Sequence, residues 1–193
     1  MEVRFSKGVL KSKKKGRTKE LDGTYVEFTP DPTIFKKYVF QEEFIVKRLW
    51  HYAYLNVGLT LTFNKEEIRS KNGLLDLLNE EVKSDRFYEP LHFRGKHVEF
   101  AFLHSTNYGE TYFSFVNGQY THNGGTHLSA FREGILKGVN EYAKKNFQGV
   151  DVREGIVGAV LVKVKDPVFE SQTKNKFANG EIRSGLVLSL IHI

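Results

Sequence analysis

The sequence contains no cysteine and no long run of apolar residues. Without cysteine, disulfides, thiolate metal sites and cysteine catalysis are all excluded. No apolar stretch approaches the roughly 20 residues that a membrane-spanning helix needs, and no signal-peptide pattern follows Met1. The 193 residues are 40% hydrophobic and 13% aromatic, enough for one good core or two small ones. We therefore expect a soluble, cytoplasmic globular chain.

Positive charge is concentrated at the start of the chain. There are 29 Lys and Arg residues against 23 Asp and Glu, which gives a net charge of +6. Residues 1–20 hold eight of the basic residues and two of the acidic ones, so the remainder is neutral. The run from Lys11 to Lys19 is interpreted as a solvated loop between two strands, with contact to phosphate as the alternative. Net charge alone therefore does not identify a nucleic-acid-binding protein.

Helical and strand periodicities alternate along the chain, which predicts an α+β fold. A strand, the basic loop and a second strand are expected over residues 1–28, followed by a helix over residues 41–56. Further strands are expected over residues 59–63, 98–102, 112–116 and 159–164, with a short helix at residues 74–78. The clearest helical pattern runs from Leu128 to Tyr142, and Thr126 is its predicted N-cap.

Common catalytic motifs are also missing. The sequence has no GxSxG elbow, no P-loop and no GxGxxG pattern, so hydrolase triads and ordinary nucleotide loops have no support. His104, His122 and His127 flank one glycine-rich turn, but none has the spacing that places two ligands on one metal. Structural or surface histidines are favoured over a zinc site, and we predict no metal centre.

The segment 169–176 is the best candidate for a polyanion-binding loop. It follows a predicted strand, and Gln172, Lys174 and Lys176 supply an amide and two ammonium groups. An ammonium is a compact charge that suits a terminal phosphate, and an amide can donate a hydrogen bond to the same group. By chemistry alone, an ordinary solvated loop is the competing interpretation.

Five strings occur in a fixed order over residues 1–183: DGTYVEFTPD (22–31), KRL with LN (47–49 and 55–56), GGTHL with FR (124–128 and 131–132), REG (153–155) and DPVFESQTK (166–174). Together they resemble the ATPase subunits of bacterial type II DNA topoisomerases, namely gyrase B and the B subunit of topoisomerase IV. The stretches WHYAY (50–54) and NGLLD (72–76) resemble topoisomerase IV more than gyrase. The family's Lys-Leu-Gly-Asn after the loop is KFAN (176–179) here.

The resemblance implies two partial domains. Residues 1–72 would be the C-terminal part of a GHKL-type ATPase domain, the end of its sandwich. Residues 73–187 would be a transducer domain, a two-layer sheet-and-helix fold of the ribosomal-protein type. Residues 188–193 resemble the translation of a sequencing adapter and are expected to be a non-native tail. The family's catalytic glutamate, magnesium-binding asparagine, adenine-binding aspartate and lid are expected before residue 1, so this fragment alone is predicted to be inactive.

The resemblance also assigns site residues. Lys174 and Gln172 would contact the γ-phosphate of ATP, while Thr24 and Val26 would lie on the adenine side of the pocket. Arg132 matches a position that faces the cavity through which DNA passes, with a structural salt bridge as the alternative. ATP and magnesium would serve the intact protein, and the fragment is expected to bind neither.

The expected function is that of a fragment of a topoisomerase IV-like ATPase subunit, which couples ATP binding and hydrolysis to DNA strand passage. Its expected partners are DNA, an A-type topoisomerase subunit and a second copy held through the N-terminal region, with no membrane. Gyrase B, whose enzyme introduces negative supercoils, is the near alternative. A further alternative is a non-enzymatic nucleic-acid-binding module of the same fold that uses Lys11 to Lys19 on phosphates, with salt-dependent affinity and no nucleotide effect.

Overall fold

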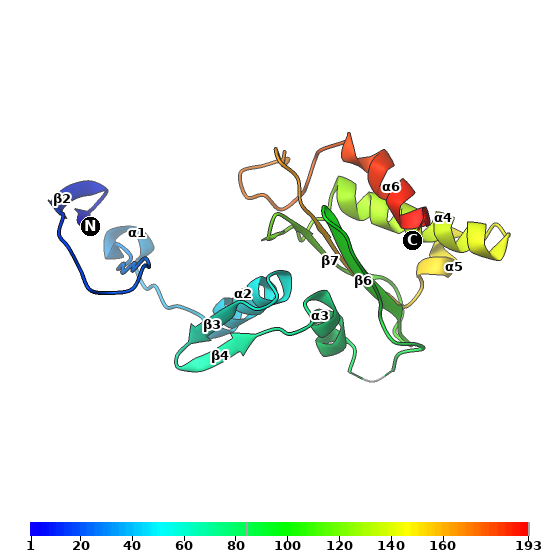
Figure 1. Cartoon of the computed structure of the whole chain (residues 1–193), viewed down its shortest axis with the longest axis horizontal. Coiled ribbons are helices and arrows are strands. Elements are labelled where there is room, and N and C mark those ends of the chain that lie inside the picture. The colour runs from blue at the N-terminus through cyan, green and yellow to red at the C-terminus, as the bar shows by residue number, and fades with distance from the viewer. Residues whose placement is uncertain (84, 193) are drawn as a thin grey trace. The chain divides into compact units, whose positions relative to one another are not determined.

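The computed structural model describes residues 1–83 and 85–192. These residues fall into two compact units, which divide after residue 42. The elements along the chain (Figure 1) are β1 (Glu2–Ser6), β2 (Val9–Lys14), α1 (Pro32–Phe35), α2 (Glu42–Leu55), β3 (Thr60–Phe63), β4 (Glu66–Arg69), α3 (Leu74–Glu81), β5 (Leu91–Arg94), β6 (Val98–His104), β7 (Thr111–Val116), β8 (Gln119–Tyr120), α4 (Thr126–Ala143), α5 (Gly149–Arg153), β9 (Ile156–Val162) and α6 (Ile182–His192).

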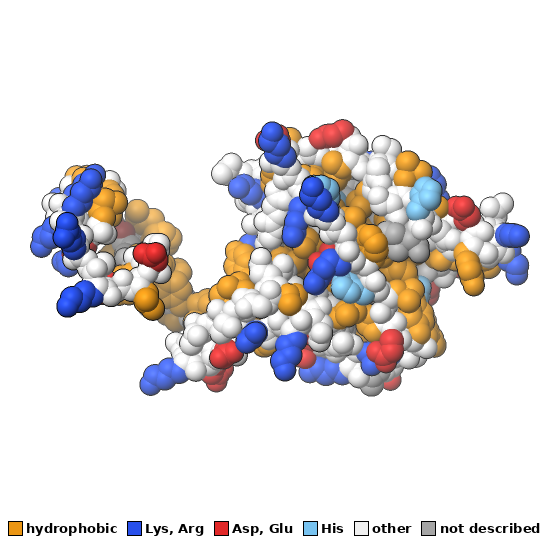
Figure 2. Space-filling view, viewed as in Figure 1, with side chains coloured by type: hydrophobic (Ala, Val, Ile, Leu, Met, Phe, Trp, Pro, Cys, Tyr) orange, Lys and Arg blue, Asp and Glu red, His pale blue; other side chains and the backbone are white. Residues whose placement is uncertain are grey.

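The N-terminal unit contains an antiparallel hairpin of β1 and β2. Lys7 and Gly8 join the strands with φ of 51° and 76°, the two-residue turn whose twist suits a hairpin. The second strand therefore follows at once, and the predicted strand at residues 24–28 is wrong, since residues 23–30 form neither helix nor strand. The predicted basic loop is wrong in its first part, because Lys11 to Lys14 belong to β2. Figure 2 shows Lys and Arg side chains gathered on this unit.

The larger unit is built on a five-stranded mixed sheet with the order β5-β6-β9-β7-β8. The central strand β9 runs antiparallel to β6 and parallel to β7, and all seven of its residues are buried. Its sequence, IVGAVLV, is a continuous apolar run, which is typical of a strand covered on both faces. A separate hairpin, β3-β4, precedes α3.

Helices cover both faces of the sheet (Figure 1). On one face, α2 and α3 contribute Tyr54, Leu74 and Leu78 to a core that includes alternate residues of β6, β7 and β9. On the other face, α4 and α6 enclose a second core around Phe131 and Leu190. The predicted α+β class is confirmed, and α3 adds a layer to the two-layer arrangement expected for residues 73–187. None of the helices in the described part of the chain combines the length and apolar character needed to span a bilayer.

Helix α2 is confirmed close to its predicted bounds. The buried side of the helix includes His51, whose ring lies edge-on to Phe115 at 5.6 Å between centroids. Burial, reinforced by the nearby Lys47 and Arg48, lowers the pKa of His51 to about 4. The helix ends at Leu55, and the side-chain amide of the next residue, Asn56, donates to the Tyr52 carbonyl at 2.9 Å. The His51 contact packs α2 against β7, and the Asn56 hydrogen bond closes the helix end.

Helix α4 is confirmed, but its predicted cap is wrong. Gly125 occupies the N-cap position, and Thr126 is the first helical residue. The backbone N–H of Thr126 donates instead to the carbonyl of Phe177 at 3.0 Å, so a distant segment satisfies the helix end.

Helix α6 packs closely against α4 at Gly134. A Cβ at Gly134 would lie 2.6 Å from the side chain of Leu190, and the missing side chain allows this approach. Residues 188–192 of the predicted tail end α6, and residue 193 lies outside the described residues.

Candidate functional site

The base of the loop after β9 is closed like a small hairpin. Phe169 and Phe177 form an antiparallel bridge, and the backbone N–H of Glu170 donates to the carbonyl of Lys176 at 3.1 Å. The side chains of the same pair form an ion pair, with Lys176 Nζ 2.8 Å from Glu170 Oε1. One of the two ammonium groups that the sequence offered is therefore already engaged inside the loop.

The tip of the loop is a tight turn over Ser171, Gln172, Thr173 and Lys174. The backbone N–H of Lys174 donates to the Ser171 carbonyl at 3.0 Å, and the Ser171 and Thr173 hydroxyl oxygens lie 2.7 Å apart. Lys174 has a φ of 57°, in the left-handed region, and its side chain is exposed. Within the described residues Lys174 forms no ion pair. Its ammonium group is the loop cation that an anion can reach.

The departure from the family pattern after the loop is accommodated by the core. Phe177 is only 1% exposed and packs edge-on against His127 and Phe169, with ring centroids 5.3 and 5.9 Å away. Asn179 is also buried, and its Oδ1 accepts a hydrogen bond from the Val168 N–H at 2.6 Å. The loop is thus braced on both sides of its base.

The same segment is tied to the start of α4. Three backbone hydrogen bonds of 3.0 Å each connect Asn123 N–H to Asn175, Phe177 N–H to Gly124, and Thr126 N–H to Phe177. Gly125 lies at the closest approach, with φ 124°, and a Cβ there would be 2.1 Å from the Phe177 carbonyl oxygen. Only glycine fits this position without a shift of the backbone. The loop and α4 therefore hold a fixed register.

Lys174 lines a cavity of about 600 Å³ between the loop, the end of α2 and the β7-β8 turn. Gln172 is not among its lining residues, so the structure brings only one of the two predicted phosphate contacts to this hollow. A lysine that the sequence analysis did not single out, Lys163, lines the same cavity. The signal available for it was a basic residue directly after the apolar run of β9. Amide side chains at Asn56, Asn117 and Gln119 complete the polar part of the wall.

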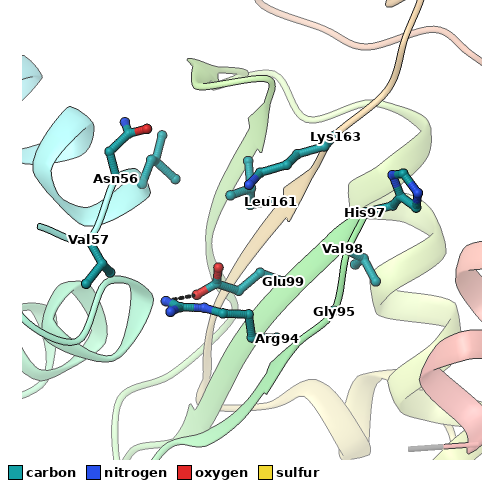
Figure 3. Close-up of a pocket in the computed structure, with 10 residues that line it drawn as sticks. Asn56, Val57, Arg94, Gly95, His97, Val98, Glu99, Leu161 and Lys163 are labelled. Atoms are coloured by element: carbon teal, nitrogen blue, oxygen red, sulfur yellow. Dashed lines mark hydrogen bonds and ion pairs between the residues drawn. The ribbon is translucent and has the colours of Figure 1, made fainter. Parts of the chain in front are cut away.

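A second hollow of about 350 Å³ adjoins the first and shares four lining residues with it: Leu55, Asn56, Leu161 and Lys163. Figure 3 shows residues that line this second hollow, among them Arg94 and Glu99, which are joined by a dashed line. Arg94 Nη2 lies 2.9 Å from Glu99 Oε1, and His92 Nε2 lies 3.0 Å from the same oxygen. The carboxylate in this hollow is thus already occupied by two side chains from β5.

Arg132, the predicted DNA-facing residue, lies in a polar cluster around Glu110. The Glu110 carboxylate accepts hydrogen bonds from Arg132 at 2.8 Å, Arg153 at 3.1 Å and the Tyr112 hydroxyl at 2.7 Å. Arg132 also lies over the Tyr112 ring, 5.6 Å from its centroid. The salt bridge left open as the alternative for Arg132 is present, and its side chain is still 42% exposed.

The electrostatics of this cluster favour the ion pairs. Burial by itself would raise the pKa of Glu110, but the hydrogen bonds from Tyr112, Arg132 and Arg153 outweigh it and hold that pKa below its usual value. Burial, together with the Glu110 carboxylate, raises the pKa of Tyr112. Glu110 thus joins the start of β7 to α4 and α5. Among the described residues, the Arg132 Nε is buried without a hydrogen-bond partner.

The remaining predicted residues lie elsewhere. Thr24 and Val26 are exposed in the N-terminal unit. His127 is fully buried, its Nε2 lies 3.1 Å from the Thr121 hydroxyl, and burial lowers its pKa to about 4. His104 Nε2 lies 2.7 Å from the Val152 carbonyl oxygen. In the described ranges, no group of three or more His, Asp or Glu side chains is arranged to hold a metal ion.

Comparison with known proteins identifies the family. The sequence model of the DNA gyrase B family matches residues 72–191, well over half of the chain. The chain belongs to this family. The B subunit of DNA topoisomerase 4 from Borreliella burgdorferi is 52% identical over 186 residues, covering 96% of this chain and 31% of that protein. The B subunit of DNA gyrase from Streptococcus pyogenes serotype M3 is 36% identical, covering 86% of this chain and 29% of that protein.

Solved structures agree with the assignment to the gyrase B family. The 43K ATPase domain of Thermus thermophilus gyrase B superposes with a TM-score of 0.70 at 30% identity, over 86% of this chain and 50% of that one. The B-subunit of Myxococcus xanthus DNA gyrase has a TM-score of 0.76 at 20% identity, which supports the fold alone. The resemblance inferred from the five strings is confirmed, and the higher identity to a topoisomerase IV protein confirms the preference over gyrase.

This member of the gyrase B family spans about a third of the length of the relatives it matches. The family match begins at residue 72, whereas the compact units divide after residue 42 because α2 packs against the sheet. The predicted domains, 1–72, 73–187 and a tail at 188–193, stay predictions.

Proposed function

We propose that this chain is part of the ATP-dependent subunit of a topoisomerase IV-like enzyme, which couples ATP binding and hydrolysis to DNA strand passage. One observation carries the proposal. Lys174 stands exposed at the tip of a braced loop and lines a cavity beside α2, while the other loop ammonium, Lys176, is paired with Glu170. A free ammonium on a rigid base is the arrangement that suits a terminal phosphate.

In this proposal, Lys174 contacts the γ-phosphate of ATP, and Gln172 donates a hydrogen bond from the same turn. Thr24 and Val26 lie on the adenine side of the nucleotide pocket. The contact exists only while the terminal phosphate is present, so it stabilises one arrangement of the loop and the nucleotide domain over another. The loop is hydrogen-bonded to the start of α4, the helix that carries Arg132. In this proposal, a movement of the loop on phosphate binding therefore also moves the start of α4.

DNA is the proposed macromolecular substrate. An A-type topoisomerase subunit and a second copy of the ATPase subunit are the proposed partners, in the cytoplasm. Arg132 is the proposed DNA-facing residue, since its guanidinium is still half-exposed beside its ion pair with Glu110. Magnesium is proposed to accompany ATP in the intact protein.

The test uses an intact ATPase subunit into which this segment is built, with its A-type partner and supercoiled DNA. We expect ATP-dependent relaxation without the introduction of negative supercoils, and a roughly 100-fold slower ATP turnover with Lys174→Ala, as for loss of a transition-state charge contact. Unchanged turnover in the variant would remove Lys174 from the site. The isolated 193-residue chain is expected to turn over no ATP.

A further inference from the structure

The two adjoining hollows beside α2, together called the groove below, share Lys163 as a lining residue. The four residues common to both hollows include Lys163 and Asn56, and the larger hollow is lined by both Lys163 and Lys174. In Figure 3 the Lys163 side chain extends toward the end of α2 at Asn56, whereas His97 points away from it. The groove therefore has one ammonium group that lines both hollows and another, Lys174, on the wall of the larger one.

The charges along the groove do not balance. Glu99 is the only carboxylate that lines the described part of it, and Arg94 and His92 already contact that carboxylate at 2.9 and 3.0 Å. Neither Lys163 nor Lys174 forms an ion pair within the chain as described. Two uncompensated ammonium groups in one concave site attract a ligand with several negative charges.

The hydrogen-bond donors of the groove lead to the same ligand class. The Asn56 amide already donates to the Tyr52 carbonyl at 2.9 Å, and the Asn117 amide donates to the Val164 carbonyl at 2.8 Å. Apart from Arg94, which pairs with Glu99, the charged donors that line the groove are Lys163 and Lys174. Ammonium groups are compact cations that bind phosphate as point charges.

Lys163 is also the better fixed of the two cations. It directly follows the buried central strand β9, and its backbone N–H donates to the His97 carbonyl at 2.8 Å. Lys174 sits on a four-residue turn, where its backbone N–H donates to a residue of the same turn, Ser171. A ligand that spans both would meet one cation held by the sheet and one held by the loop.

We infer that Lys163 is a second phosphate-binding residue of the nucleotide-sensing site, and that it binds an oligophosphate together with Lys174. The inference rests on the proposed function, because it places the triphosphate group of the nucleotide in the groove that Lys174 lines. In this inference, the Lys163 ammonium group contacts the phosphate chain from the side of the sheet. The cavity of about 600 Å³ has the size of an ordinary small-ligand site.

The test titrates an intact ATPase subunit into which this segment is built with inorganic tripolyphosphate at low salt and measures the Kd by calorimetry. Lys163→Gln and Lys174→Gln are each expected to weaken binding about tenfold, the effect of removing one charge-assisted contact. Lys165→Gln is the matched control, since Lys165 is two residues further along, exposed, and does not line the groove. Its Kd should match that of the unmodified chain.

The outcomes separate the inference from the proposed function. Weakening by Lys174→Gln with no effect of Lys163→Gln overturns the inference and leaves the proposed function standing. No effect of either variant contradicts both. Equal weakening by Lys163→Gln and Lys165→Gln shows general surface attraction and overturns the inference. The inference is also overturned if a short DNA duplex binds the groove more tightly than tripolyphosphate and loses that affinity in Lys163→Gln.

Discussion

The Lys176 ammonium group lies 2.8 Å from the Glu170 carboxylate, across the base of the turn that carries Lys174. This ion pair closes the loop and removes one of its two cations from competition for a phosphate. Because the pair is half-exposed, its direct contribution to stability is small, about 0–1 kcal/mol. The ion pair instead fixes the geometry of the turn, since it holds the two ends together while Lys174 stays accessible.

The two lysines of the loop should therefore differ in their effect on ATP turnover. In the intact subunit, Lys176→Ala should slow turnover only a few-fold, against roughly 100-fold for Lys174→Ala. Steady-state ATPase assays of both variants, at matched protein concentration, measure the contrast. Equal losses in the two variants would mean that the ion pair does not determine which lysine meets the nucleotide.

Gly125→Ala should destabilise the chain more than the same substitution at another glycine of positive φ that has open space around it. Gly118 has φ 83° with no atom within 4 Å of a built Cβ, so Gly118→Ala should cost about 1–2 kcal/mol of backbone strain. At Gly125 the built Cβ lies 2.1 Å from the Phe177 carbonyl oxygen, which adds an overpacking penalty of about 1–3 kcal/mol. Urea unfolding of both variants gives the difference. Equal midpoints would argue against a rigid contact between the loop and α4.

Glu110 should matter more to stability than Arg132. The Glu110 carboxylate serves three donors on different elements, so Glu110→Gln leaves two arginines with a weakened partner and should cost about 2–3 kcal/mol. Arg132→Gln leaves Glu110 paired with Arg153 and should cost about 1 kcal/mol. Chemical denaturation measures both. If Arg132 also contacts DNA, Arg132→Gln should lower the salt dependence of DNA binding by about one phosphate contact.

Stability should fall as the pH drops from 7 to 5 because two buried histidines stay neutral in the folded state. In the folded state, burial lowers the pKa of His51 and His127 to about 4, against 6.5 for an unperturbed histidine. Between these two pKa values the unfolded state binds a proton at each histidine and the folded state does not, so acid favours unfolding. Each histidine should contribute a loss of about 2 kcal/mol over this window. His51→Phe, which keeps an aromatic ring beside Phe115, should remove about half of the pH dependence.

The control for the pH measurement is His122→Gln, which replaces a histidine that is exposed in the folded chain. Urea unfolding at pH 7 and pH 5 gives the free energies for the original chain and both variants. A His51→Phe variant with the full pH dependence of the original chain would assign the effect to other groups.

Elements with local patterns could be recognised without a structure. The strand predicted over residues 159–164 and the helix predicted over residues 41–56 correspond to β9 and α2, because an apolar run and a helical spacing are local patterns. The polar and basic character of the loop at residues 169–176 was also predicted from the sequence, because it depends only on the residue types in that segment. The family followed from the same short strings.

Which of these groups are available to a ligand depends on the folded chain. The partner of Lys176 lies across a turn, the partner of Arg132 is 22 residues away, and Thr126 donates to the carbonyl of Phe177, 51 residues further along. Lys163 joins Lys174 in one cavity because β9 and the loop meet beside α2. Such pairings depend on which surfaces pack together, and packing is a property of the whole chain that no local spacing encodes.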